Sequence, residues 1–303
     1  MKTLRTSPFR RGEGGFAALL LSPTALVLLL VVAAPLVVTF GYSVFNVNLL
    51  SDHKGDFAGA ANYLKVLQSD WFWASLGRTL YFTGVSLALE TALGLLIALL
   101  LNQKFHGAAF LRVLIILPWA IPTNVSAALW KWIYHPEFGV LNAVLSGLGL
   151  VSTYQAWLSD PFVAMNMVIG ADVWKMTPLA AVFFLAALQF VNKAMYEAAL
   201  IDGAGALRRF WTITIPFLTP TILVVVVMRT VEKFKAFDLF YVMTRGGPAN
   251  GTKVLTYEAF LRGFTNLDFS MAATLAYLIA AIILGLSVVY MRVLKTQEGV
   301  RDA

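Results

Sequence analysis

Residues 196 to 204 read Tyr196-Glu197-Ala198-Ala199-Leu200-Ile201-Asp202-Gly203-Ala204, and they lie between two apolar runs that are each long enough to cross a lipid bilayer. The stretch begins with good helix formers, and Gly203 can adopt the positive φ that ends a helix. A second short helix can follow from Ala206 to Trp211, and Pro216 suits the first turn of the next span. We therefore expect a helix, a turn and a helix over 191–216, lying along the membrane surface.

The composition excludes an ordinary soluble domain, because 59% of the 303 residues are hydrophobic and only 13% are charged. The net charge of +7 is not gathered into a basic, aromatic-rich module, so we expect no nucleic-acid partner. The chain has no cysteine, and His53, His106 and His135 are too scattered for a zinc centre. It also lacks a GxxxxGK[ST] phosphate loop. We expect a membrane protein that is not an enzyme and binds no metal or other cofactor itself.

Six apolar segments are long enough to span a bilayer, and short polar tails cover residues 1–15 and 293–303. The first tail is basic, as in a signal peptide, but the apolar run after it is too long and lacks a clean cleavage site. Twelve basic residues fall in the segments assigned to the cytoplasm and five in the external loops, so we expect both termini inside. The predicted spans cover about 16–40, 76–101, 113–134, 162–190, 211–243 and 269–290.

Ionisable residues inside these spans are candidates for function, because a charge at membrane depth is costly. Glu90 stands alone in the second predicted span, where an interhelical hydrogen bond is the alternative explanation. Arg229, Glu232 and Lys233 fall on one face of a helix in the fifth span. This pattern indicates either a charged cluster that faces a water-filled cavity or the polar end of the span.

A substrate pathway is predicted where planar rings and hydrogen-bonding groups occur together, since these are the groups that bind sugars. Pro118 and Pro122 should bend the third span, and a bent helix can line a cavity. Packing or anchoring at the membrane interface is the alternative role of each aromatic residue. The candidate pathway residues are Asn124, Trp130, Trp174, Lys175, Glu232, Lys233, Phe237, Asp238 and Tyr241.

The opening stretch resembles the EAA loop of permease subunits of ABC importers. The match extends over Glu197-Ala198-Ala199, Asp202-Gly203-Ala204, Phe210, Ile213 and Pro216, with Ile215 where the family usually has Leu. Further along, Phe237-Asp238 and the segment 244–248 resemble the family's Phe-Asp and Thr-Gly-Gly-Gly-Pro segments, with Arg245 in place of the first Gly. The resemblance covers about residues 16 to 292 and is greatest to permeases of maltose, trehalose and related oligosaccharide importers.

This resemblance implies an all-α, type I ABC importer permease fold with six transmembrane helices in a bacterial or archaeal cytoplasmic (inner) membrane. It implies that the loop docks into a groove of a separate ATPase subunit. The implied partners are a second homologous permease, two copies of that ATPase with their ATP and Mg, membrane lipid, and an external binding protein that delivers a sugar. The implied coupling residues are Glu197, Ala198, Ala199, Asp202, Gly203 and Ala204.

Two other functions remain open at this point. A glycerol-phosphate importer shares the fold and motifs, and Arg229, Lys233 and Arg245 would suit an anionic ligand. A transporter driven by an ion gradient belongs to a different class. It would need a coupling carboxylate such as Glu90 or Glu232 and would not need the docking loop.

Overall fold

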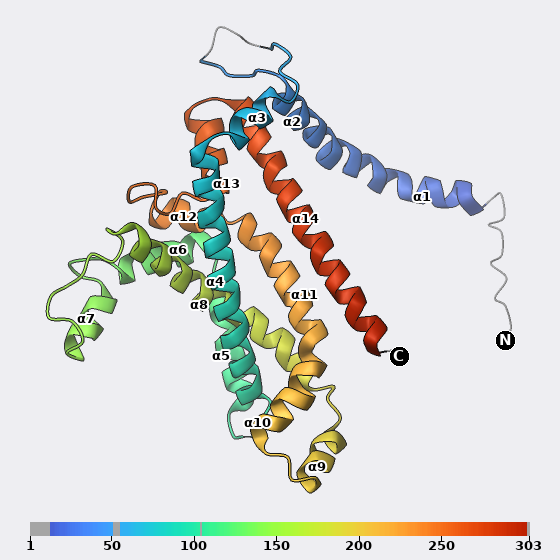
Figure 1. Ribbon diagram of the computed structural model, residues 1–303, viewed down its shortest axis with the longest axis vertical. Helices are drawn as coiled ribbons and strands as arrows, with labels where there is room; N and C mark the ends of the chain where they lie inside the picture. The colour runs from blue at the N-terminus through green and yellow to red at the C-terminus, as the bar shows by residue number, and fades with distance from the viewer. Residues whose placement is uncertain (1–12, 51–54, 104, 302–303) are drawn as a thin grey trace.

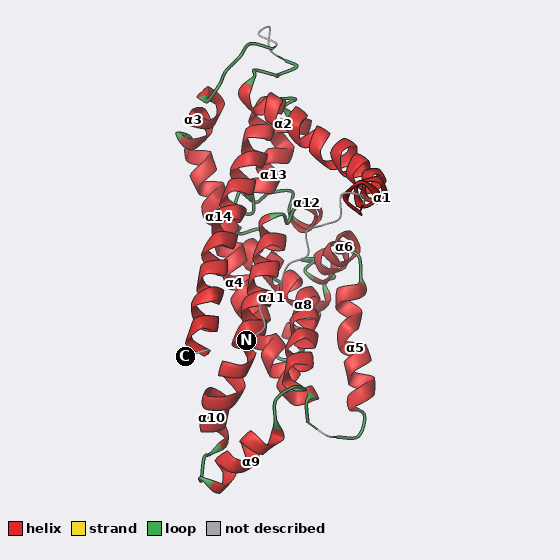
Figure 2. Cartoon of the chain, turned by 90° about the vertical axis from the view of Figure 1, so that its right-hand side faces the viewer, coloured by secondary structure: helices red, strands yellow, loops and turns green. Residues whose placement is uncertain are grey.

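The computed structural model describes residues 13–50, 55–103 and 105–301, and helices make up most of this part of the chain (Figures 1 and 2). Residues 1–12 and 302–303 of the two predicted tails, and His53, lie outside it. Three short π-helical segments, Leu29–Ala33, Phe210–Thr214 and Leu261–Thr265, continue or join the α-helices. The α-helices are α1 Glu13–Leu28, α2 Ala34–Val44, α3 Ala61–Leu67, α4 Asp70–Leu101, α5 Ala108–Ala120, α6 Thr123–Ile133, α7 Val140–Gly147, α8 Pro161–Leu188, α9 Lys193–Ile201, α10 Ala206–Arg209, α11 Ile215–Phe234, α12 Asp238–Met243, α13 Leu255–Phe260 and α14 Phe269–Arg301.

Each predicted span corresponds to a helical segment of sufficient length and apolarity. Among the described residues, five segments qualify singly, and α5 together with α6 forms a bent pair that qualifies as a sixth. The five are Phe16–Val44, Asp70–Leu101, Pro161–Leu188, Ala206–Phe234 and Phe269–Arg292. The structure thus has the all-α, multi-span architecture that the sequence predicts.

The third predicted span, 113–134, differs from the expectation of one bent helix. It is divided into α5 and α6, whose axes differ by 94°. Ile121 and Pro122 are both extended between them, with ψ of 132° and 141°. Since Pro122 has no N–H to donate and its ring disfavours a helical residue before it, the helix stops at Ala120. The prolines therefore break this segment where the sequence predicts a bend.

The fifth predicted span, 211–243, also differs. The long helix ends at Phe234, and residues 238–243 form the separate helix α12. The Lys235 and Ala236 amides close the end of α11 on the carbonyls of Glu232 and Lys233. The chain then turns at Phe237, so the apolar run 239–243 continues in another direction. After α12, Arg245 adopts φ +50°, a left-handed conformation that favours glycine. This explains why the family that the sequence resembles usually has Gly at this position.

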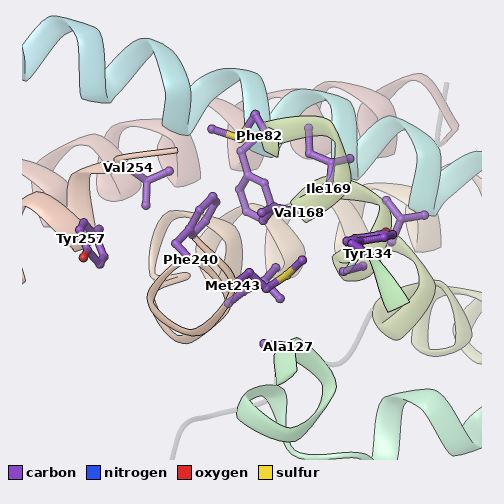
Figure 3. Close-up of a cluster of buried hydrophobic side chains, with 13 residues drawn as sticks. Phe82, Ala127, Tyr134, Val168, Ile169, Phe240, Met243, Val254 and Tyr257 are labelled. Atoms are coloured by element: carbon purple, nitrogen blue, oxygen red, sulfur yellow. The ribbon is translucent and has the colours of Figure 1, made fainter. Parts of the chain in front are cut away.

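Close packing of α4 on α8 forms the centre of the bundle. A Cβ on Gly94 would lie 2.8 Å from the Cβ of Ala180, so the absence of a side chain lets the two helices touch. Figure 3 shows the buried cluster on one side of this contact, where Phe82 of α4 meets Phe240 of α12 with ring centroids 4.9 Å apart. This cluster fixes α6 and α12 against α4 and α8.

The two ends of the bundle carry different elements. Figure 1 shows α9 and α10 together at the lower end, whereas α3 and α13 lie at the opposite end. Helices α1 and α2 lean away from the bundle, and α2 is held to α14 by a hydrogen bond of 2.6 Å from the Tyr277 hydroxyl to the Leu36 carbonyl. The loop singled out by the sequence is therefore a projection from one end of the molecule.

Candidate functional site

Helix α9 and the turn after it are determined by local hydrogen bonds. Asn192 caps the start of α9, where its side chain accepts from the Ala194 amide at 3.0 Å. At the other end, the Ala204 amide donates to the Ala199 carbonyl at 2.8 Å and the Gly203 amide to the Leu200 carbonyl at 3.0 Å. These two bonds, with Gly203 at φ +75°, form a Schellman motif. The predicted helix stop at Gly203 is confirmed.

The loop presents its side chains outward. Glu197, Ala198, Asp202 and Gly203 are exposed, while Ala199 and Ala204 are half-buried against each other's turn. Apolar groups are exposed here too, above all Ile201 at 88% and Leu207 at 72%. Apolar side chains that are exposed together beside charged ones indicate an interaction surface, because their contact with water is unfavourable unless a partner covers them.

This surface is attached firmly to two spans. Helix α10 runs through the π-helical segment Phe210–Thr214 into α11, so the second half of the loop is the end of the fifth span. The first half is tied to it by a 2.8 Å hydrogen bond between the Tyr196 and Thr214 hydroxyls. Only residues 189–192 separate α9 from α8. A force applied to α9 therefore reaches both α8 and α11.

A network of charged side chains is buried between α4, α8 and α11. Arg229 donates to Glu90 through Nε at 3.1 Å and through a terminal nitrogen at 3.4 Å, and it also pairs with Glu232. Lys233 pairs with both Glu90 and Asp172. Arg229, Lys233 and Glu90 are at most 2% exposed. Buried charges of this kind are tolerated only when paired, so the network fixes the relative positions of three helices.

A small polar pocket of about 130 Å³ lies beside the network. The charged residues that line it are balanced, with three acidic and three basic side chains. Four of the predicted pathway residues, Glu232, Lys233, Phe237 and Asp238, line it together. The other lining residues are Thr123, Asp172, Met176, Arg229, Lys235, Ala236 and Leu239.

The remaining predicted pathway residues do not line this pocket. Trp130 of α6 and Trp174 of α8 meet with ring centroids 5.5 Å apart and planes at 73°. Tyr241 stacks on Phe237 at 5.3 Å and is 42% exposed. Asn124 is exposed on the first turn of α6. Close by, burial raises the pKa of the Tyr257 hydroxyl above its ordinary value, and its ring centroid lies 6.0 Å from that of Phe237.

Lys175 has a different position from the one expected of a ligand contact. Its amino group donates to the carbonyls of Trp119, at 3.2 Å, and Ile121. These carbonyls are freed where α5 breaks, and an ammonium group satisfies them at the C-terminal end of the helix dipole. Lys175 therefore holds the bend that orients α6, with Asn124 and Trp130 on it.

Glu90, Asp172 and Lys235 belong to this site but are not among the predicted pathway residues, although Glu90 is a candidate of its own and has the interhelical hydrogen bonds expected as the alternative. Glu90 stands alone in an apolar span, and Asp172 shares its span with Lys175. The cation that both acids contact, Lys233 of α11, is more than sixty residues away from each along the chain. Lys235 shows no signal beyond its charge. A rule that pairs opposite charges among predicted spans could have found the first two.

The fold and site together define a class: a multi-span helical membrane protein with an exposed helix–turn–helix between two packed spans and a polar pocket between those spans. Comparison with known sequences matches residues 90–298 to the family described as binding-protein-dependent transport system inner membrane component. The trehalose/maltose transport system permease protein of Thermococcus litoralis is 37% identical over 289 residues, which are 95% of this chain and 96% of that protein. The sn-glycerol-3-phosphate transport system permease protein of Yersinia pestis is 34% identical over 242 residues, 79% of this chain and 80% of that protein.

Among solved structures, a bacterial ABC transporter involved in the import of the acidic polysaccharide alginate matches with a TM-score of 0.81. It is 22% identical and the match covers 94% of this chain and 96% of that one, which shows the fold. The chain belongs to the family of binding-protein-dependent transport system inner membrane components. The family resemblance drawn from the EAA loop and the multi-pass inner-membrane location are thereby confirmed.

Proposed function

We propose that this chain is the permease subunit of an ATP-driven importer and forms half of the translocation pathway for a sugar. The observation that carries the proposal is the exposed α9 turn, with Glu197 and Gly203 on it, rigidly joined to both α8 and α11. A second homologous permease supplies the other half of the pathway. An extracytoplasmic binding protein delivers the sugar, in keeping with the name of the family.

The energy for transport comes from a separate ATPase, of which two copies bind ATP and Mg. When the ATPase pair closes, it moves the element that is bound in its groove. The exposed face of α9 can bind there through Ile201 and the Glu197 carboxylate. Since α10 and α11 form one continuous helical segment, this motion tilts α11 as a rigid body. The pocket between α8 and α11 then opens to one side of the membrane or the other. The chain itself carries out no chemical step.

The pocket favours a neutral substrate. Its acidic and basic lining residues are equal in number, and both Arg229 and Lys233 are paired with carboxylates of this chain. A glycerol-phosphate ligand would have to displace these carboxylates from their cations, which leaves buried acids without partners. A sugar needs hydrogen bonds and aromatic contact instead, and Asp238 and Phe237 supply these groups at the pocket wall. We infer a di- or oligosaccharide from the name of the trehalose/maltose relative, and a ligand of that size requires the pocket of about 130 Å³ to widen when α11 tilts.

The same network argues against a transporter driven by an ion gradient. A coupling carboxylate must be able to gain and lose its cation during the cycle. Glu90 is buried and bonded to both Arg229 and Lys233, and Glu232 is bonded to Arg229. Their charges are already compensated within the chain.

Uptake by reconstituted vesicles with and without the ATPase subunit tests the proposal. Labelled trehalose or maltose should enter only when the ATPase, ATP and the loaded binding protein are all present. Uptake that survives removal of the ATPase and follows an imposed ion gradient would overturn it. Uptake of glycerol phosphate but of no sugar would overturn the substrate assignment alone.

A further inference from the structure

A large cavity lies beside the start of α9, apart from the polar pocket. It measures about 920 Å³, is open on one side, and is bordered by the end of α4, the α4–α5 turn, the start of α5, the end of α8 and the first turn of α9. Figures 1 and 2 both place the α4–α5 turn at the same end of the molecule as α9. The cavity therefore begins where the spans α4 and α8 end, at the depth of lipid headgroups.

The lining of this cavity is amphipathic and carries one sign of charge. Arg112, His106 and Lys193 are basic, and none of the described residues that line it is acidic. Neutral polar groups come from Asn102, Gln103, Gln189 and Tyr196, and apolar walls from Phe105, Ala108, Ala109, Leu188 and Val191. Such a lining complements a molecule with an anionic head and an apolar body.

The position of Arg112 on α5 favours a lipid over a protein segment as the occupant of the cavity. It lies one turn inside the apolar helix α5, between Leu111 and Val113, whose side chains are 39% and 63% exposed. Its guanidinium donates to the Leu101 carbonyl at 2.9 Å, which uses one of its five N–H donors. Because its apolar neighbours are exposed on a helix that qualifies as part of a membrane span, we place Arg112 near the bilayer surface. A phospholipid phosphate lies within reach of its guanidinium there, whereas a partner in the aqueous phase would have to enter the headgroup region.

We propose that this cavity binds the headgroup of an anionic phospholipid, with Arg112 and Lys193 on either side of its phosphate and the apolar wall against its glycerol and upper acyl region. The bound lipid links α5 to α9, two elements that no hydrogen bond in the described structure joins directly. It thereby restrains the helix that, under the proposed function, meets the ATPase. The chemistry recognised is a phosphodiester on an apolar anchor whose headgroup carries no compensating positive charge, so that the lipid is net anionic.

The test uses the full chain purified in detergent and native mass spectrometry with added phosphatidylglycerol or phosphatidylcholine of the same acyl chains. We expect phosphatidylglycerol to be retained about tenfold more tightly than phosphatidylcholine, as contacts from two basic residues at a membrane surface allow. Arg112→Gln combined with Lys193→Gln should abolish that preference. Arg208→Gln removes an exposed charge on α10 at the same end but outside the cavity, and should leave it unchanged.

A conservative variant separates lost binding from lost folding. Arg112→Lys keeps the charge and should keep the preference for phosphatidylglycerol. Equal retention of the two lipids by the wild-type chain, or an unchanged preference in the double variant, would overturn the proposal. Displacement of the lipid by soluble glycerol phosphate at the same concentration would show a small-anion site instead.

A protein occupant is a further outcome that would overturn it. The double variant would then keep its bound phosphatidylglycerol but release the ATPase subunit in lipid-free detergent. Lipid retention is measured without transport, so a negative result leaves the coupling role of α9 standing. Conversely, failure of ATP-driven uptake would leave the lipid measurement intact.

Discussion

The α9 turn and the buried charge network are both connected to α8 and α11, but the first is formed by local contacts and the second by long-range ones. The turn is exposed and is made by backbone bonds between residues at most five positions apart. The network is buried and joins Glu90 to Lys233 across 143 positions of sequence. A partner can therefore bind and move the turn without reorganising the core, while the network keeps the attached spans in fixed relative positions. Variants in the two regions should differ in what they damage.

The largest effect should follow from breaking the network. Lys233→Met leaves Asp172 and Glu90 without one of their cations in a buried site, which costs about 3–5 kcal/mol. Thermal unfolding in detergent, followed by loss of the monodisperse peak on size exclusion, should show a marked fall in midpoint. Lys235→Met changes the same residue type on an exposed position two residues away and should leave the midpoint unaltered. Equal midpoints for all three proteins would show that the network contributes nothing to stability.

Gly203→Ala should damage coupling without such a loss of stability. A Cβ at Gly203 meets no atom within 4 Å, so the penalty is the strain of φ +75°, about 1–2 kcal/mol for an L-residue. We expect ATP-driven uptake by vesicles to fall by about tenfold, since the turn reorients Asp202 and Ala204. Gly205→Ala is the matched control, because Gly205 has φ −63° and open space around it. Similar uptake by the two variants would contradict a role for the turn's geometry.

Substitutions at the polar pocket should change substrate dependence and nothing else. Asp238→Ala removes an exposed hydrogen-bonding group from the pocket wall, and loss of one such bond to a neutral sugar raises the half-saturating concentration by about tenfold. Trp174→Ala should act in the same direction through Trp130. Binding of the ATPase subunit, measured by co-purification, should be unchanged. Unaltered uptake kinetics in both variants would remove these residues from the pathway.

The smallest effect should come from the cap of α9. Asn192→Ala removes the acceptor of the Ala194 amide and costs about 1 kcal/mol of local helix stability. Hydrogen exchange should speed up over residues 193–196 by several-fold, with the rest of the bundle unaffected. Arg208→Gln, which keeps the cap and lies on α10 outside the cavity, should not show this change. Unchanged exchange in Asn192→Ala would mean that tertiary contacts, such as that of Tyr196 with Thr214, are sufficient to stabilise the first turn of α9 without the cap.

The same contrast between local and long-range contacts explains how much of this structure the sequence can predict. The helix stop at Gly203 and the apolar spans depend on neighbouring residues, and the sequence shows them. The prolines of the third span show that it departs from a straight helix, but the sequence predicts a bend where the structure has a break at Pro122. The pattern leaves the end of α11 at Phe234 open as one of two alternatives, because the apolar run resumes at Leu239 after a turn that only tertiary packing requires. Lys175 looks like a pathway residue in sequence, yet it is bonded to the carbonyls of a helix end fifty-four residues away. Pairings between distant spans require the structure.

The most direct test of the central claim is a single-cysteine measurement, which the absence of native cysteine makes clean. Ile201→Cys places one thiol on the most exposed apolar position of the α9 turn. In membranes that contain the assembled transporter, this thiol should cross-link to the ATPase subunit and should resist a membrane-impermeant maleimide added outside intact cells. Labelling from outside, or cross-links that form only to other proteins, would contradict the account that α9 transmits ATPase motion to α8 and α11.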